Sequence, residues 1–209
     1  MGSTVLGLLT NEGVILFSEK RATSKLLISD SVEKLYKIEN NVAFAVSGLV
    51  ADAKVLVEQA RNEAANHWFN FNEDIPVITL TKYICDLALR FGEDSSEDSL
   101  VMSRPFGAAV LIAGFDESGY SLYHADPSGT YTAYSAKAIG SGSEMAQTSL
   151  EEKWAPNWTI AEGLKCGLTI MKNIMEEKLT FETIQIAIIS RTHGVKFLTL
   201  DEIKNELNF

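Results

Sequence analysis

The sequence predicts an α+β fold, a layered sandwich in which helices cover the outer faces of packed antiparallel sheets. Two observations carry this prediction. Strand-like runs follow one another as hairpins, with four of them before the first helical pattern, and consecutive hairpins build antiparallel sheets. Helical patterns then come in pairs between groups of strands, which disfavours a doubly wound parallel sheet.

The first half of the chain shows two hairpins and then a pair of helices. Apolar runs flank the short turns Asn11-Glu12-Gly13 and Glu39-Asn40-Asn41, whose residues favour tight turns. Apolar residues then recur at three- and four-residue steps, which is typical of amphipathic helices. The predicted strands are 4–10, 14–18, 34–38 and 42–46, and the predicted helices are 50–67 and 77–91.

The second half repeats this alternation of strands and helix pairs. An acid opens and a glycine closes each of two turns, 116–119 and 126–129, which separates three predicted strands. Thr159 followed by Glu162 is a capping box, which marks the start of a helix. The predicted strands are 107–115, 120–125, 130–134, 137–139, 184–189 and 195–200, and the predicted helices are 143–154, 159–178 and 201–207, the last capped by Asp201.

Size and composition fit a single domain over residues 1–209. The 209 residues are 46% hydrophobic and 9% aromatic, which is enough apolar material for a sizeable core and argues against disorder. The formal charge of −10 argues against general affinity for nucleic acid or anionic membranes. No apolar run approaches the ~20 residues that a membrane-spanning helix needs.

The reactive side chains offer little to metal, cofactor or disulfide chemistry. His67, His124 and His193 stand far apart and form no ligand spacing, so we expect no metal site and no cofactor. Cys85 and Cys166 lie in apolar helical patterns, which favours free thiols in a reducing compartment.

Seven short motifs follow one another along the chain from Gly2 onward. They are Gly2-Ser3-Thr4-x-x-Gly7, Lys20-Arg21-Ala22-Thr23-Ser24, Val32-Glu33-Lys34, Ser47-Gly48-Leu49-Val50-Ala51-Asp52-Ala53, Arg104-Pro105-Phe106-Gly107, Asp126-Pro127-Ser128-Gly129 and Ile139-Gly140-Ser141-Gly142. Their order and spacing resemble those of proteasome alpha subunits, and the set is far more specific than any single motif. The segment from Arg61 to Glu73 narrows the resemblance to one type of alpha subunit.

The resemblance implies a fold, a role and partners. The implied fold is the four-layer αββα sandwich of N-terminal-nucleophile hydrolases, two antiparallel sheets flanked by helices. The implied role is that of a non-catalytic subunit in the seven-membered alpha ring of the proteasome core particle. Such a subunit serves ring assembly, activator docking and substrate entry for ubiquitin-dependent protein degradation in the cytoplasm and nucleus. The implied partners are neighbouring alpha subunits, beta subunits and the C-terminal tails of activators.

An active N-terminal-nucleophile hydrolase is the rival hypothesis. Related beta subunits use an N-terminal threonine whose own amine is the general base. The matching positions here are Ser3, Glu19, Lys34, Glu177 and Thr180. Because Gly2 precedes Ser3, the free amine lies on the wrong residue, and we expect no catalytic residue unless the chain is cleaved after Gly2.

Lys34 has a second implied role. In alpha subunits of this family the matching lysine lines a pocket between neighbouring subunits and receives the C-terminal carboxylate of an activator. Backbone groups near Gly2 and Leu49 complete that pocket by resemblance. An ammonium and a terminal carboxylate form a charge-assisted bond. Without the resemblance, a solvated lysine at a strand edge is the plainer interpretation.

Two further features concern the assembly. Trp68 and Phe69, at the end of the first predicted helix, are candidates for anchors of the ring interface, with capping of the core as the alternative. Alpha subunits of the family carry a tail with a Tyr-Asp-Arg motif and a helix ahead of the Gly-Ser-Thr strand. Neither occurs in these 209 residues, and a naturally reduced subunit, a misplaced start codon and a trimmed chain all account for this.

Overall fold

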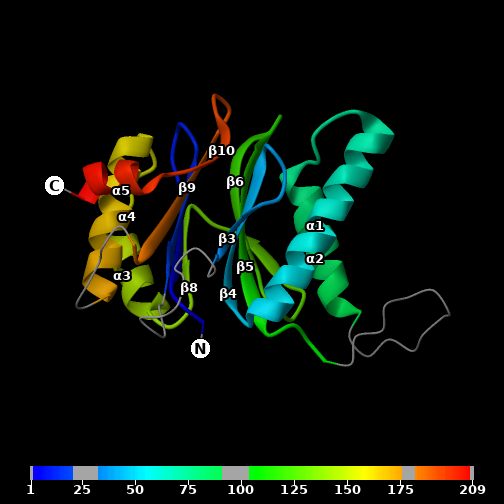
Figure 1. Ribbon diagram of the computed structural model, residues 1–209, viewed down its shortest axis with the longest axis horizontal. Coiled ribbons are helices and arrows are strands. Elements are labelled where there is room, and N and C mark those ends of the chain that lie inside the picture. The colour runs from blue at the N-terminus through cyan, green and yellow to red at the C-terminus, as the bar shows by residue number, and fades with distance from the viewer. Residues whose placement is uncertain (1, 21–32, 91–103, 176–181, 208–209) are drawn as a thin grey trace.

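The computed structural model describes residues 2–20, 33–90, 104–175 and 182–207, and shows four stacked layers (Figure 1). Two five-stranded sheets lie face to face in the middle, and helices cover both outer faces. This is the predicted αββα sandwich of antiparallel sheets. Every strand pair within the two sheets is antiparallel.

The strands divide between the sheets in a simple pattern. The first sheet has the order β10-β9-β2-β1-β8, and the second has the order β3-β4-β5-β6-β7. The strands of the first sheet are β1 (Val5–Leu9), β2 (Val14–Glu19), β8 (Ala136–Ile139), β9 (Ile184–Ser190) and β10 (Gly194–Phe197). The strands of the second are β3 (Leu35–Lys37), β4 (Val42–Gly48), β5 (Ala108–Asp116), β6 (Gly119–Ala125) and β7 (Tyr131–Ala133).

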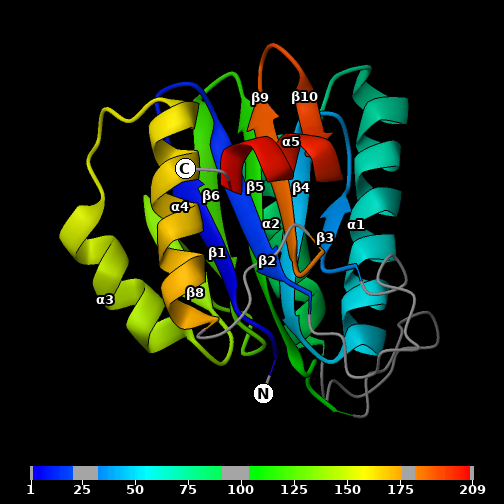
Figure 2. The ribbon, with the colours of Figure 1, turned by 60° about the vertical axis from the view of Figure 1, so that its left-hand side comes forward.

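Each sheet has its own helix layer. Helices α1 (Val50–Phe71) and α2 (Val77–Leu89) cover the second sheet (Figure 1). Helices α3 (Ser143–Lys153), α4 (Ile160–Ile174) and α5 (Leu200–Leu207) cover the first (Figures 1 and 2). The predicted capping box starts α4, with Thr159 and Glu162 bonding each other's backbone amides.

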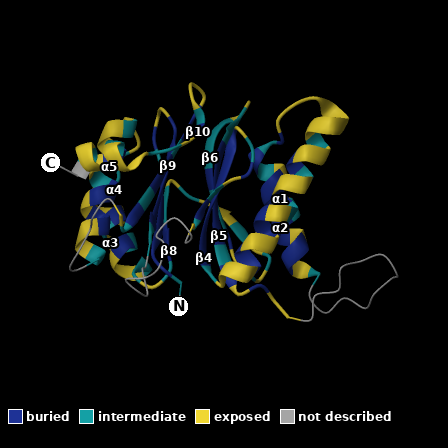
Figure 3. Cartoon of the chain, viewed as in Figure 1, coloured by how far each residue is buried: buried dark blue, intermediate teal, exposed yellow. Residues whose placement is uncertain are grey.

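The core has three apolar layers because the central strands are buried on both faces (Figure 3). In β2, Ile15 and Phe17 pack toward the helices, whereas Val14 and Leu16 face the other sheet. Successive side chains of a strand point to opposite faces. A strand covered on both sides therefore reads as a continuous apolar run, as the central strands do here.

Helix α4 packs very closely against β2. A Cβ added to Gly163 would lie 2.8 Å from the Cδ1 of Ile15, and one added to Gly167 would collide with the ring of Phe17. The two glycines, four residues apart, leave a flat stripe on the helix. This stripe brings the helix axis close to the sheet.

Several helix ends differ from the sequence-based expectation, and α4 ends at Ile174 instead of continuing to 178. Helix α1 continues to Phe71 and ends at Asn72, which has a left-handed φ of 54°. At α5 the expected Asp201 cap is wrong, because Thr199 takes that place. The Thr199 hydroxyl accepts from the Glu202 amide (3.3 Å), and the Glu202 carboxylate accepts from the Thr199 amide (2.8 Å).

Candidate functional site

The residues expected to receive an activator tail lie at one end of the sandwich, where β1 and β3 begin and β4 ends (Figure 2). The Lys34 carbonyl accepts a hydrogen bond from the Val46 amide of β4 (2.9 Å). Gly2 lies against the last residues of β4, since a Cβ on Gly2 would collide with Ser47 and the Gly48 amide. The structure therefore brings Gly2, Lys34 and Leu49 to the same end.

Lys34 borders a shallow hollow of about 10 Å³. A space of that size holds about one water molecule, so the hollow is not an enclosed pocket for a peptide terminus within this chain. The hollow is lined by Glu33, Lys34, Tyr36, Val46, Gly48, Val50 and Ala53. Lys34 is half-buried, and its amide donates to Oε1 of Gln185 in β9 (3.4 Å).

Leu49 connects β4 to α1 and exposes its side chain, whereas its own amide and carbonyl are both hydrogen-bonded within the chain. Its amide donates to the Gly107 carbonyl (2.9 Å), and its carbonyl accepts from the Ala53 amide (3.0 Å). The side chain is 54% exposed. Leu49 is also the N-cap residue of α1 and makes no capping hydrogen bond from its side chain, which leaves the first-turn amides of the helix without a side-chain acceptor from that position.

An ion pair fixes the start of α1. Asp52 is 7% exposed and accepts hydrogen bonds from both terminal nitrogens of Arg104 (2.7 and 2.8 Å) and from the Gly107 amide (2.6 Å). Hydrogen bonds from Arg104, and then that from Gly107, lower the pKa of the Asp52 carboxyl. The pair ties the first turn of α1 to the segment ahead of β5, and so holds Leu49 in place.

Ser3 is sealed inside the chain. Its carbonyl accepts from the Ser47 hydroxyl (2.8 Å), and the preceding carbonyl of Gly2 accepts from the Ser141 amide (3.0 Å). Ser3 is 3% exposed, and its hydroxyl has no hydrogen-bond partner among the described residues. A hydroxyl in this position does not meet a substrate.

The positions that match the catalytic residues of beta subunits have structural tasks here. The nitrogen of Ser3 is a peptide nitrogen bonded to Gly2, so it cannot act as a general base. The Glu19 carboxylate accepts from the Thr4 amide (3.1 Å) and so supports the start of β1. Glu177 and Thr180 lie outside the described residues. The rival hypothesis of an active hydrolase is not favoured.

Trp68 and Phe69 lie at the far end of α1 from Leu49. Their side chains are 55% and 83% exposed, so neither caps the core of this chain. Phe71, one turn on, is exposed as well. These aromatic side chains are thus available to a partner, although sequence reasoning singled out only the first two.

Other binding chemistry is sparse in the part of the chain that the structure describes. No three His, Cys, Asp or Glu side chains there gather as a metal would require. The described helices include none that is both long and apolar enough to cross a membrane. Cys85 and Cys166 are free, and burial, followed by the charge of Asp86, raises the pKa of the Cys85 thiol to about 11.

A family model described as a proteasome subunit matches residues 1–189. The chain belongs to the proteasome subunit family. It is similar to proteasome subunit alpha type-5 of Dictyostelium discoideum, with 50% identity over 186 residues that cover 89% of this chain and 77% of the relative. The Caenorhabditis elegans alpha type-5 subunit is 43% identical over 208 residues, covering 100% of this chain and 83% of the relative. A probable alpha type-5 subunit of Schizosaccharomyces pombe is 45% identical over 203 residues, covering 97% and 82%.

Within the proteasome family, this subunit is of the alpha type, a non-catalytic member of the alpha ring. These relatives are alpha type-5 subunits, and this is the type that the segment from Arg61 to Glu73 indicates. The internal, sealed Ser3 gives a physical reason for the lack of catalysis. An N-terminal nucleophile needs both an exposed hydroxyl and its own free amine.

Proposed function

We propose that this alpha subunit helps to build a heptameric ring of the proteasome core particle and docks the C-terminal tail of an activator at Lys34. Its partners are the neighbouring alpha subunits and the beta subunits. Docking there serves substrate entry for ubiquitin-dependent protein degradation in the cytoplasm and nucleus. The subunit itself does not cleave peptide bonds.

One observation supports the docking role above the others. Lys34 lines a hollow together with Gly48 and Val50, so the lysine lies next to the start of α1. The ammonium and the first-turn amides of a helix both favour a carboxylate, and no Leu49 side-chain bond caps those amides. The hollow is too small for a peptide terminus by itself, which suits a site completed by the neighbouring subunit.

The proposal is tested in assembled core particles that carry Lys34→Ala. Binding of an activator tail beside this subunit should weaken by about tenfold or more, since a charge-assisted bond is worth about 1.5–3 kcal/mol. Peptidase stimulation should fall with it. Tail-peptide affinity and stimulated peptide hydrolysis are the two measurements.

Two variants make the test specific. Lys34→Arg keeps the charge and should retain most of the binding. Lys37→Ala removes an exposed lysine three residues further on, in β3, and should leave docking unchanged. Among the described residues, the Lys37 ammonium hydrogen-bonds only to the nearby Asn40. Equal stimulation of wild-type and Lys34→Ala particles, by a tail shown to dock beside this subunit, would contradict the proposal.

A further inference from the structure

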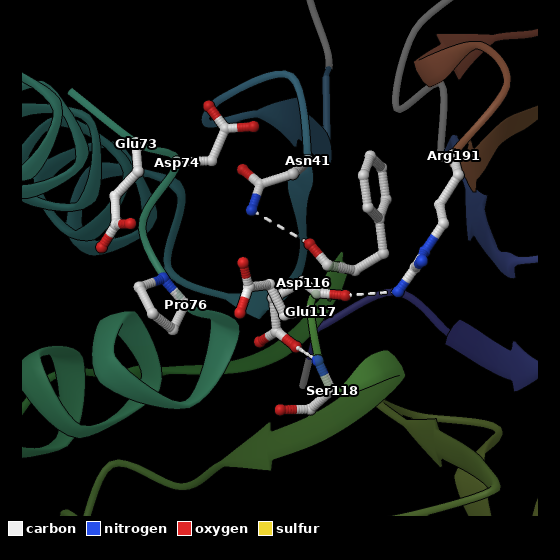
Figure 4. Close-up of a pocket in the computed structure, with 9 residues that line it drawn as sticks. Asn41, Glu73, Asp74, Pro76, Asp116, Glu117, Ser118 and Arg191 are labelled. Atoms are coloured by element: carbon white, nitrogen blue, oxygen red, sulfur yellow. Dashed lines mark hydrogen bonds between the residues drawn. The ribbon is translucent and has the colours of Figure 1, made fainter.

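A cavity of about 540 Å³, whose lining residues are drawn in Figure 4, opens among turns at the other end of the strands from Lys34. Four connections far apart in the sequence form it. Asn41 comes from the β3–β4 turn, Glu73 to Pro76 from the α1–α2 loop, Asp116 to Ser118 from the β5–β6 turn, and Arg191 from the β9–β10 turn. The cavity is therefore a product of the layer packing and not of one loop.

The lining is strongly acidic. Four acidic residues, Glu73, Asp74, Asp116 and Glu117, line it together with one arginine, Arg191, and all but Asp116 are exposed to solvent at its rim. Arg191 donates to the Asp116 carbonyl (2.6 Å), so its hydrogen bond goes to a backbone group and not to a carboxylate. The Asp116 carboxylate accepts from the amides of Val77 (3.0 Å) and Ser118 (2.8 Å).

Three of the four carboxylates, unlike that of Asp116, have no partner among the described residues. Among the described residues, neither an ion pair nor a hydrogen bond engages the side chains of Glu73, Asp74 and Glu117. Like charges gathered around one concave space repel one another, and a cation placed among them relieves that repulsion. The cavity therefore favours a positively charged occupant.

Asn41 points to the same conclusion independently. It is 1% exposed, and its amide nitrogen donates to the carbonyls of Ile75 and Phe115 (both 3.1 Å). Its Oδ1 is buried with no partner among the described residues and lies on the cavity side (Figure 4). A buried acceptor is stabilised when a donor pairs with it, so the wall at Asn41 suits a group that donates hydrogen bonds.

Exposed aromatic side chains lie beside the cavity. Trp68, Phe69 and Phe71 end α1, two residues or more before Glu73. The Asn72 amide donates to the Trp68 carbonyl (2.7 Å), and a ring nitrogen of His67 lies 3.2 Å from the Glu73 carbonyl. The end of α1 that carries these rings is therefore held against the segment that provides the acidic wall at Glu73.

We propose that this cavity binds an arginine side chain presented by a neighbouring proteasome subunit. A guanidinium carries five donors in a flat fork, which suits several acceptors on different walls, namely Asn41 Oδ1 and the carboxylates of Glu73, Asp74 and Glu117. The exposed aromatic rings provide apolar and cation–π contact for the same partner. The inference rests on the proposed function for the identity of the partner only.

The first test uses the full-length chain and a small probe, N-acetyl-arginine amide. Its neutral analogue, N-acetyl-citrulline amide, has nearly the same shape and no charge. The arginine probe should shift the backbone amide NMR signals of Val77 and Ser118 in a saturable way, because both donate to Asp116 at the cavity wall. The citrulline probe should not. Equal responses to both probes would overturn the inference.

Matched variants locate the binding. The triple variant Glu73→Gln, Asp74→Asn, Glu117→Gln should weaken the arginine response by about tenfold or more. The control Glu58→Gln, Asp86→Asn, Glu152→Gln makes the same charge change at exposed helix positions outside the cavity lining and should bind as the wild type does. An unchanged response of the first variant would refute the site.

A second measurement identifies the partner in the assembled particle. A photo-crosslinking amino acid at position 117 should capture a segment of another subunit that contains an arginine. A captured segment without arginine, or no captured subunit, would overturn the inference. If the chain enters particles and docks tails through Lys34 but ignores the arginine probe, this inference alone fails. If it never enters particles, the proposed function fails and probe binding still reports on the cavity.

Discussion

The two ends of the sandwich are built from the same strands and differ in chemistry. At one end, Lys34 and the start of α1 border a hollow of about 10 Å³. At the other, uncompensated carboxylates line a cavity of about 540 Å³ beside exposed aromatic rings. In a sandwich of antiparallel hairpins, successive turns lie alternately at the two ends of the molecule. The two ends are therefore formed by different turns and can carry different side chains. This difference is the basis for the anionic partner that we propose at the first end and the cationic partner that we propose at the second.

The two ends also differ in how one aspartate at each end is hydrogen-bonded. Asp52 holds the Lys34 end together with a cation and a backbone amide. Asp116 organises the opposite end through two backbone amides, with no cation on its carboxylate among the described residues. Asp52 thus connects three segments of the chain, whereas Asp116 caps the start of α2 and its own turn. The difference predicts how each end responds to substitution.

The largest effect is expected from Asp52→Ala. It removes the acceptor of two Arg104 hydrogen bonds and one Gly107 hydrogen bond at a buried position. The free energy of unfolding should fall by about 3 kcal/mol, within the range for charged, buried hydrogen bonds. Urea denaturation of the full chain measures this. A loss below that of Asp116→Ala would show that the Lys34 end is not the more firmly pinned one.

The same pair predicts a pH dependence. The folded-state pKa of Asp52 is lowered, so its contribution to stability is present above the unfolded-state pKa of about 4. That contribution is lost as the pH falls through the lowered value. The stability gap between wild type and Asp52→Asn should therefore be widest near neutral pH, start to narrow at about pH 4 and close only below the lowered pKa of Asp52. A gap that stays constant down to acid pH would assign the loss to packing instead of charge.

A smaller effect is expected from Asp116→Ala. The variant removes the acceptor for the first amide of α2 and for the Ser118 amide of the β5–β6 turn. Loss of such a cap costs about 1 kcal/mol. Faster hydrogen exchange at Val77 and Ser118, with Lys34-dependent tail binding unchanged in particles, is the expected pattern. Impaired tail binding would show that the two ends are coupled.

The smallest effect is expected from Glu33→Gln. Glu33 lines the hollow beside Lys34, and its negative charge opposes an incoming carboxylate. Neutralising this exposed charge beside Lys34 should strengthen activator-tail binding by about two- to fivefold, and the effect should be clearest at low salt. A tail-peptide titration at two salt concentrations measures it. Weaker binding would mean that Glu33 itself contacts the tail.

Most of the fold was predictable because hairpins and amphipathic helices have local patterns. The turn at Asp116 follows its predicted chemistry, with an Asp carboxylate accepting from the amide two residues on. The end of α1 was missed because Trp68, Phe69 and Phe71 are exposed and so do not continue the buried stripe. The α5 cap was missed because Thr199 and Leu200 had been assigned to a strand, although Thr199 and Glu202 have capping-box spacing.

The two candidate sites differ in how far the sequence predicts them. Gly2, Lys34 and Leu49 were nominated by family motifs, and the structure brings them to one end. No local pattern connects Asn41 with Asp116 or Arg191, which are 75 or more positions apart, so the acidic cavity became visible only through the strand order. The buried acceptor that Asn41 presents there, unpaired among the described residues, has no sequence signature at all.

At Gly2, near Lys34, solvent exposure does not imply tolerance to substitution. The residue is half-exposed, yet any side chain there would have to displace Ser47 and the Gly48 amide. Gly140 meets the carbonyl of Ser3 in the same way, at a φ of 99° that other residues rarely adopt. A saturation mutagenesis scan should therefore find these glycines as restrictive as core leucines. Protein engineering at the Lys34 end should therefore keep these glycines and change only the surrounding side chains.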